Sequence, residues 1–138
     1  HGKNAEYALC AAQWHKTLSY SDEFFGDGAQ YDKEFTEIYG YAPPYQAAES
    51  SAALLVYKAA FEKANSFDKD KVRDALAQTD MQTFYGNIKF SDTGQNIAKP
   101  MVLFQVRCEG DECANRVVAP TKWASHELVH PIPAWSTR

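Results

Sequence analysis

The sequence predicts an α/β fold that is incomplete on its own: a parallel strand, then helices, then antiparallel strands at the carboxyl end. A compact apolar run at 6–14 comes first, and helical patterns fill most of 27–78. Runs rich in aromatic and β-branched residues, which are typical of strands, follow from 84 onward. This order of elements indicates an α/β architecture.

The first run, EYALCAAQW at 6–14, predicts a strand buried on both faces, because it is too short for an ordinary helix and is bounded by polar residues. Such strands occur in parallel sheets and need hydrogen-bonded neighbours on both sides. The rest of the chain offers too few, so we expect a missing amino-terminal portion or a partner chain to complete the sheet. Cys10 is expected to be a buried small hydrophobe.

Three helices are predicted next. The segment 27–39 is amphipathic and is followed by Gly40 at the usual C-cap position, which indicates a surface helix. The segment 44–65 starts at a proline suited to a first helical turn. Its middle is apolar almost all the way round, so we expect burial on more than one face. Asp68 can cap a short third helix that ends near Gln78.

The carboxyl part reads as strands at 84–90, 101–107 and 116–119, with turns at 91–95 and 108–113. The tail, 121–138, carries two tryptophans and two prolines and is expected to pack as an irregular strap over apolar surface. With no linker apparent, 1–138 reads as one segment.

The cysteines and the tail histidines raise questions of bonding. Cys108 and Cys113 flank the polar turn EGDE, and a hairpin there could bring their Cα atoms within the roughly 7 Å that a disulfide needs. A disulfide, which would indicate an oxidising compartment, and two free thiols both remain open.

His126 and His130 could share a helix face, but a proline follows and a third metal ligand is lacking, so we expect no metal site and no cofactor.

Length and charge restrict the function classes. A chain of 138 residues with a net charge of −4 and no Lys/Arg cluster lacks the electrostatic pattern of nucleic-acid binding. No apolar run reaches the roughly 18 residues of a membrane span, and no signal-peptide pattern stands at the front. Because the chain begins at His1, we expect it to be processed, proteolysed or incomplete.

Several stretches together resemble a known family: GKNAEYALCAAQWH, then the segment from FFGDG to FEKA, then KVRDALAQTDMQTFYGNIKFSDTGQN and VVAPTKWA. In this order they resemble the carboxyl-terminal third of type I periplasmic solute-binding proteins of ABC importers, and most closely the branched-chain amino acid and amide receptors. The similarity covers about Gly2 to Trp123. CEGDEC and the tail after Ala124 depart from the pattern.

The resemblance implies a two-lobed protein, periplasmic or extracellular, that traps a small-molecule ligand by hinge closure and delivers it to an ABC permease. It implies that this chain holds part of the second lobe and the last crossover. The resemblance also implies that the groups with which family members hold the ligand's carboxylate and amino group would lie before His1. It also places an aromatic residue that faces the cleft on or near Trp14.

Four residues are the candidate ligand contacts. Trp14 and His15 follow the first strand, at the edge where ligands bind in open α/β sheets. Tyr20 could close over a ligand, and Tyr45 lies at a helix start, where free N–H groups can meet an anion. For each of them, packing within the core or over a neighbouring helix is the alternative.

An enzyme is disfavoured, because no G-x-S-x-G, H-E-x-x-H or phosphate-binding glycine loop occurs. The leading hypothesis is therefore a binding function, for an amino acid, amide or related organic acid, within an extracytoplasmic receptor. The alternative is a structural or interaction subunit that packs into a larger assembly through its sheet edge and its aromatic-rich tail.

Overall fold

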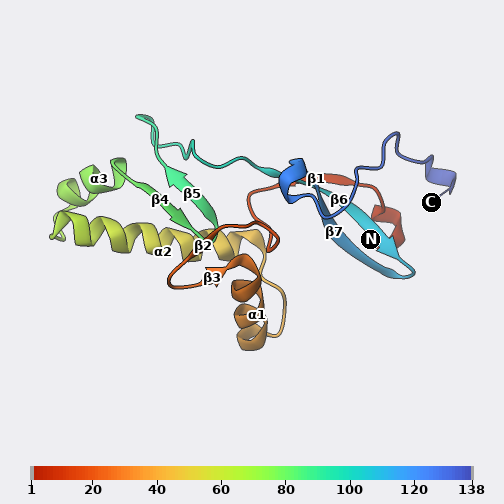
Figure 1. Ribbon diagram of the computed structural model, residues 1–138, viewed down its shortest axis with the longest axis horizontal. Helices are drawn as coiled ribbons and strands as arrows, with labels where there is room; N and C mark the ends of the chain where they lie inside the picture. The colour runs from red at the N-terminus through yellow and green to blue at the C-terminus, as the bar shows by residue number, and fades with distance from the viewer. Residues whose placement is uncertain (1, 138) are drawn as a thin grey trace.

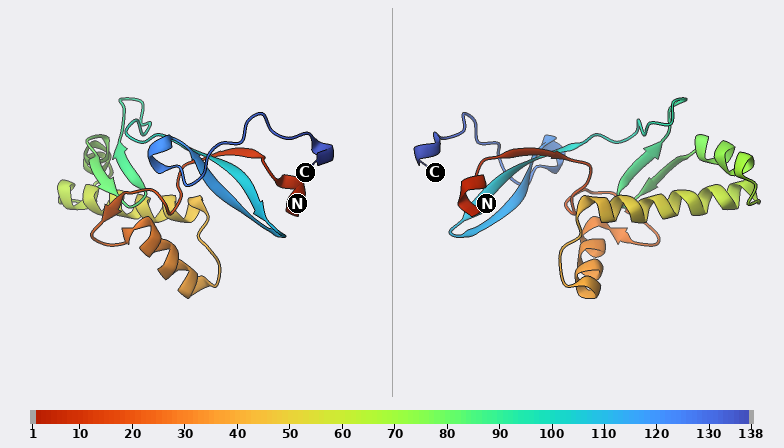
Figure 2. Two further views of the ribbon diagram at one scale, coloured as in Figure 1. Left: turned by 45° about the vertical axis from the view of Figure 1, so that its right-hand side comes forward. Right: turned by 180° about the vertical axis from the view of Figure 1, so that it is seen from behind.

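The computed structural model describes residues 2–137 and shows two bodies lying side by side (Figure 1; Figure 2). The helical body, residues 21–90, holds the α-helices and two short hairpins. The sheet body, residues 2–12 and 102–137, is built on a three-stranded sheet with the order β1-β6-β7. Two crossovers join the bodies, the first at 13–20 and the second at 91–101 (Figure 1). The α/β class is as predicted.

The first two helices begin and end where local signals predicted. α1 (Gly28–Tyr39) follows Asp27, whose carboxylate accepts a hydrogen bond from the backbone N–H of Gln30 at 2.8 Å. It ends at Gly40, which is left-handed with φ 78°. α2 (Tyr45–Ala64) starts after a proline and ends in a left-handed asparagine. Both predicted helices are confirmed to within about a residue.

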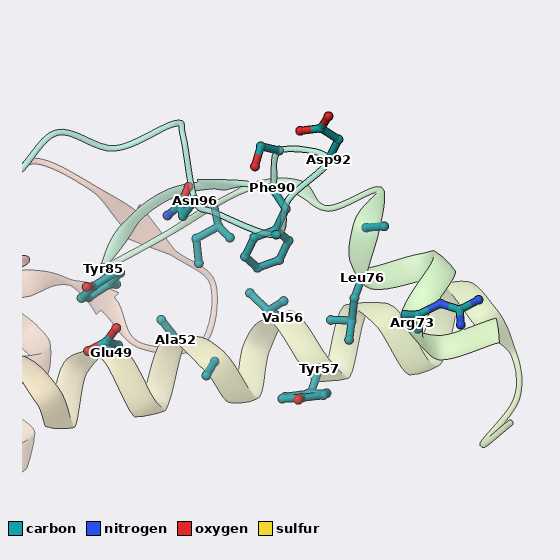
Figure 3. Close-up of a pocket in the computed structure, with 15 residues that line it drawn as sticks. Glu49, Ala52, Val56, Tyr57, Arg73, Leu76, Tyr85, Phe90, Asp92 and Asn96 are labelled. Atoms are coloured by element: carbon teal, nitrogen blue, oxygen red, sulfur yellow. The ribbon is translucent and has the colours of Figure 1, made fainter. Parts of the chain in front are cut away.

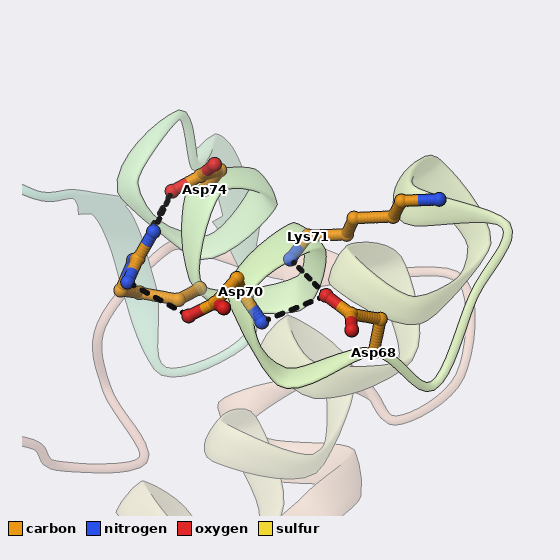
Figure 4. A network of polar contacts seen from close by, with 5 residues as sticks. Asp68, Asp70, Lys71 and Asp74 are labelled. Atoms are coloured by element: carbon orange, nitrogen blue, oxygen red, sulfur yellow. Dashed lines mark hydrogen bonds and ion pairs between the residues drawn. The ribbon is translucent and has the colours of Figure 1, made fainter.

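α3 (Lys69–Ala77) is a short helix held by its cap (Figure 4). The Asp68 carboxylate accepts hydrogen bonds from two backbone N–H groups of the first turn, each at 3.1 Å, a cap that typically stabilises by about 1 kcal/mol. Arg73 also forms ion pairs with Asp70 at 3.0 Å and Asp74 at 2.7 Å. Because all three side chains are exposed, these pairs add little stability.

The prediction that α2 is buried on more than one face was wrong. Only one face is buried, and Leu54, Tyr57 and Phe61 on another side are exposed. Within residues 2–137 no second layer covers that side, so tertiary context overrides the nearly uniform apolar pattern. The buried residues of α2 are Ala48, Ala52, Leu55, Val56 and Ala60.

The strand predicted at 84–90 is present as β5 (Gly86–Lys89), but its partner in a hairpin was not predicted. β4 (Asp80–Thr83) pairs antiparallel with β5, and Phe84 and Tyr85 connect them. The sequence of β4, DMQT, contains no aromatic residue and only one β-branched residue, Thr83, so the strand escaped prediction. A second hairpin, β2 (Ser21–Asp22) with β3 (Gly26–Asp27), is too short to leave a pattern.

The first strand of the sheet body differs most from expectation. β1 (Leu9–Ala12) pairs antiparallel with β6 (Val102–Glu109), and three of its four residues, including Cys10, are exposed. The prediction of a parallel strand buried on both faces was therefore wrong, as was the predicted burial of Cys10. Among residues 2–137 no strand pairs with the other side of β1, so its outer edge leaves backbone groups unpaired in the sheet.

A disulfide and the tail complete the sheet body. β6 turns into β7 (Glu112–Ala119), and Cys108 and Cys113 are disulfide-bonded across the turn with a Cα–Cα distance of 4.0 Å. After β7, the part of the tail up to residue 137 forms short 3-10 turns at Thr121–Trp123 and Trp135–Thr137 and is otherwise irregular. His126 and His130 lie between these turns and do not share a helix.

One core runs through both bodies. Its centre is Phe84, which is fully buried, and it extends from the Ala48 face of α2 to Phe104 on β6 and Trp123 in the tail. The two bodies therefore meet at a packed junction, and the open space beside this junction is the natural place to look for a site.

Candidate ligand-binding cleft

A cavity of about 580 Å³, here called the junction cleft, lies where the two bodies meet. Its walls come from the first crossover, α1, the loop before α2, the start of α2, β6, β7 and the tail. Three of the four predicted ligand contacts, Trp14, His15 and Tyr45, line it together. The other lining residues are Lys16, Thr17, Asp32, Ala42, Pro43, Pro44, Gln46, Phe104, Ala114, Asn115, Arg116 and Ser125.

Trp14 serves both the core and the cleft wall. The residue is 4% exposed, and its ring makes edge contacts with Tyr31 at 5.8 Å and Phe84 at 6.1 Å between ring centroids. The indole N–H donates to the backbone carbonyl of Phe84 at 3.4 Å. Because that donor is engaged, Trp14 offers the cleft a rigid apolar surface.

His15 is held in one orientation beside it. Its Nδ1 accepts a hydrogen bond from the backbone N–H of Thr17 at 3.3 Å and lies 2.9 Å from the hydroxyl of the same residue. In the neutral ring the proton is therefore assigned to Nε2. Burial, and then the neighbouring charge of Lys16, lower the pKa of His15. The ring also meets Phe104 edge-on at 5.3 Å, so a neutral imidazole with Nε2–H as donor forms this side of the cleft.

Tyr45 opens α2 at the same cleft. The first intrahelical bonds run from Ala47 and Ala48 to the carbonyl of Pro44. In the described chain no side chain caps this helix start, so the N–H groups of Tyr45 and Gln46 precede the helical bonding pattern at the positive end of a helix of 20 residues. A helix start of this kind favours a carboxylate or another anionic group.

A charged pair joins the first crossover to α1 at the rim. Lys16 and Asp32 form an ion pair at 2.7 Å. The crossover passes so close to α1 that a Cβ at Gly28 would lie 2.9 Å from the Lys16 carbonyl oxygen, which explains a glycine at the first position of the helix. Sequence reasoning missed Lys16 and Asp32, because they are 16 residues apart and share no motif.

Tyr20 lies apart from the other three predicted contacts. Its ring packs against Trp123 in the tail, with 5.3 Å between centroids, and burial raises the pKa of its hydroxyl. It is not among the residues that line the junction cleft.

A second cavity of about 550 Å³, here called the helical-body pocket, lies between α2, α3 and the end of β5 (Figure 3). Val56 on α2 and Phe90 after β5 point toward each other across it, while Arg73 and Asp92 point outward (Figure 3). Its inner wall is therefore apolar, and its charged groups lie at the rim. Tyr57, on the exposed side of α2, also lines it.

A cleft at the junction of two bodies, with aromatic surface and a few converging polar groups, is typical of a protein that binds a small molecule. Within residues 2–137 no cluster of three or more His, Cys, Asp or Glu side chains could hold a metal ion. None of the helices in that range has the length and apolar character needed to span a bilayer.

Comparison with protein families agrees with this class. The profile of the periplasmic binding protein family matches residues 1–112. The chain belongs to the periplasmic binding protein family.

Solved structures share the fold at low sequence identity. The leucine binding protein LivK of Thermotoga maritima is 23% identical with a TM-score of 0.65, covering 86% of this chain and 32% of its own. A periplasmic binding protein of Burkholderia mallei is 19% identical with a TM-score of 0.69, covering 90% and 35%. A Silicibacter pomeroyi protein assigned to branched-chain amino acid ABC transport is 18% identical, with a TM-score of 0.68, covering 95% and 36%. The chain thus spans about a third of the length of these proteins.

Proposed function

We propose that this chain is part of an extracytoplasmic substrate-binding protein of an ABC importer and that it contributes one wall of the ligand cleft. The observation that carries the proposal is the convergence of Trp14, His15 and Tyr45 on the junction cleft from a crossover and a helix start. The function is binding of a small amino acid, amide or related organic acid, with no chemical step.

The chemistry of the cleft supports this ligand class. The Trp14 ring provides apolar surface for an aliphatic group, and the start of α2 favours an anionic group such as a carboxylate. A branched-chain amino acid carries both groups in one small molecule. The names of two similar solved proteins, leucine binding and branched-chain amino acid transport, agree with that chemistry.

The proposed partners and location follow from the family. Further polypeptide pairs with the outer edge of β1 and covers the exposed side of α2, and an ABC permease accepts the ligand. A periplasmic or extracellular location agrees with the Cys108–Cys113 disulfide, because such bonds persist in oxidising compartments.

The test is calorimetric titration of the intact protein with leucine, isoleucine, valine, asparagine, acetamide and succinate, with tryptophan fluorescence followed in parallel. We expect saturable binding of one equivalent of at least one compound, accompanied by a fluorescence change. Absence of binding across the whole panel would contradict the proposal.

The open edge of β1 and the exposed apolar side of α2 favour a second candidate, a structural subunit of a larger assembly without transport. Mass measurement of the protein from its natural source separates the two. A parent roughly two to three times this length, the size of two lobes, supports the receptor. A mature chain of this length that binds no compound of the panel supports the subunit.

A further inference from the structure

We propose that Lys99 is a positioning residue of the junction cleft, which fastens the second crossover to the first and so holds Trp14 and His15 in place. This inference deepens the proposed ligand-binding function and rests on it. It assigns a role to a residue outside the cleft lining, in a segment without regular secondary structure.

The contact that carries the inference joins the two crossovers directly. The Lys99 ammonium donates a hydrogen bond to the backbone carbonyl oxygen of Gln13, a residue 86 positions away in sequence. Gln13 immediately precedes Trp14 and His15, so the acceptor belongs to the stretch of backbone that presents both side chains to the cleft.

The lysine reaches Gln13 by crossing the β4–β5 hairpin. A Cβ at Gly86 would overlap the methylene groups of Lys99, so the lysine stem lies in space that only glycine leaves free. The ammonium then sits 3.8 Å from the centroid of the Tyr85 ring, in cation–π geometry. One side chain therefore contacts the helical body and both crossovers.

The surroundings make this contact sensitive to the charge of the lysine. Burial lowers the pKa of Lys99 to about 8, and Glu49 on α2 acts in the opposite direction. Burial, then Glu49 and then Tyr45, raise the pKa of Tyr85, so that ring stays neutral beneath the ammonium. Above pH 8 the lysine loses its charge, which removes the cation–π attraction and weakens the hydrogen bond to Gln13.

The consequence concerns hinge motion. In a hinged protein the crossovers absorb the backbone changes that accompany closure. Two crossovers fastened by one side chain must change together, so Lys99 restricts independent movement of the segment that carries Trp14 and His15.

The experiment measures amide hydrogen exchange in the intact, ligand-free protein at pH 7.0 and 9.5. Rates for residues 13–17 and 97–101 are corrected for intrinsic pH dependence and referred to α1. The variants are Lys99→Met, which keeps an unbranched apolar stem, and Lys99→Arg, which keeps the charge. The matched control is Lys89→Met, at an exposed lysine of β5 that forms an ion pair with Asp80 of β4.

Loss of one charge-assisted hydrogen bond corresponds to roughly tenfold faster exchange. We expect this acceleration in both crossovers for Lys99→Met at both pH values and for the unchanged protein only at pH 9.5. Lys99→Arg should stay protected throughout, and Lys89→Met should behave like the unchanged protein.

At pH 7.0, crossover exchange in Lys99→Met that equals that of the unchanged protein would overturn the inference. If Lys99→Met fails to fold, the unchanged protein and Lys99→Arg decide. Exchange in the unchanged protein that does not depend on pH would overturn the inference, and so would identical pH responses in the unchanged protein and Lys99→Arg. Because no ligand is used, such a failure leaves the calorimetric test of the proposed function intact.

Discussion

The junction cleft and the helical-body pocket have nearly equal volumes, about 580 Å³ and about 550 Å³, yet they are built differently. The junction cleft draws its walls from both bodies and combines an aromatic plane, a neutral imidazole and a helix start. The helical-body pocket lies within one body and is apolar inside. Convergence of distant segments with oriented polar groups, not volume, therefore distinguishes the candidate site.

The largest expected effect comes from Trp14, whose side chain belongs to the core and also lines the junction cleft. Trp14→Ala should lower the free energy of unfolding by roughly 3–5 kcal/mol, because a buried aromatic leaves a cavity, and it should weaken ligand binding. Chemical denaturation measures the first effect and calorimetry the second. Trp135→Ala, at an exposed tail position, is the control and should change stability by about 0.5 kcal/mol or less. Equal losses in both variants would contradict the placement of Trp14.

Removal of the Cys108–Cys113 disulfide should have the next largest effect on stability, and this effect should be strongest on the sheet-body side of the cleft. Replacing Cys108 and Cys113 together by serine should cost about 2 kcal/mol, because the closed loop is short, with a sequence separation of 5. Hydrogen exchange should quicken most in β6 and β7 and least around the helical-body pocket. Cys10→Ser, at the exposed free thiol, is the control. Acceleration in α2 and α3 as large as that in β6 and β7 would contradict this local effect.

Substitutions of two tyrosines on α2 test the two cavities against each other, because both residues are partly exposed and each lines one cavity. Tyr45→Ala should weaken binding of the tightest compound of the panel about tenfold, equivalent to about 1.4 kcal/mol. Tyr57→Ala should leave the dissociation constant unchanged. Titration calorimetry of both variants gives the answer, and the reverse pattern would move the site to the helical-body pocket.

The smallest expected effect is a pH dependence from His15. The unfolded residue takes up a proton near pH 6.5, whereas the folded one, with its lowered pKa, does so only at lower pH. The unfolded state therefore binds more protons in that window, and stability should fall as the pH is lowered through it. His15→Gln should flatten this dependence in thermal unfolding, while His130→Gln in the tail should not. An unchanged slope in His15→Gln would contradict burial of the neutral ring.

Which features of the fold the sequence predicts depends on how far apart in the sequence the interacting residues lie. The helix ends at Asp27, Gly40 and Asp68 were predicted, because capping involves residues within one turn. The exposure of β1 and the β4–β5 hairpin were not, since they depend on which neighbours the fold supplies.

The same division holds for the candidate site. Trp14 and His15 could be proposed because they follow the first strand, and Tyr45 because it begins a helix after two prolines. Asp32 in the cleft and Lys99 behind it carry no local signal, because their partners lie 16 and 86 residues away. Only the fold brings those groups together.

The most direct measurement is a crystal structure of the intact protein with the compound that binds most tightly in the calorimetric panel. We predict that the ligand lies in the junction cleft, with its aliphatic part against Trp14 and its anionic group at the N–H groups that begin α2. A ligand seated between Val56 and Phe90 in the helical-body pocket, with the junction cleft empty, would contradict the account.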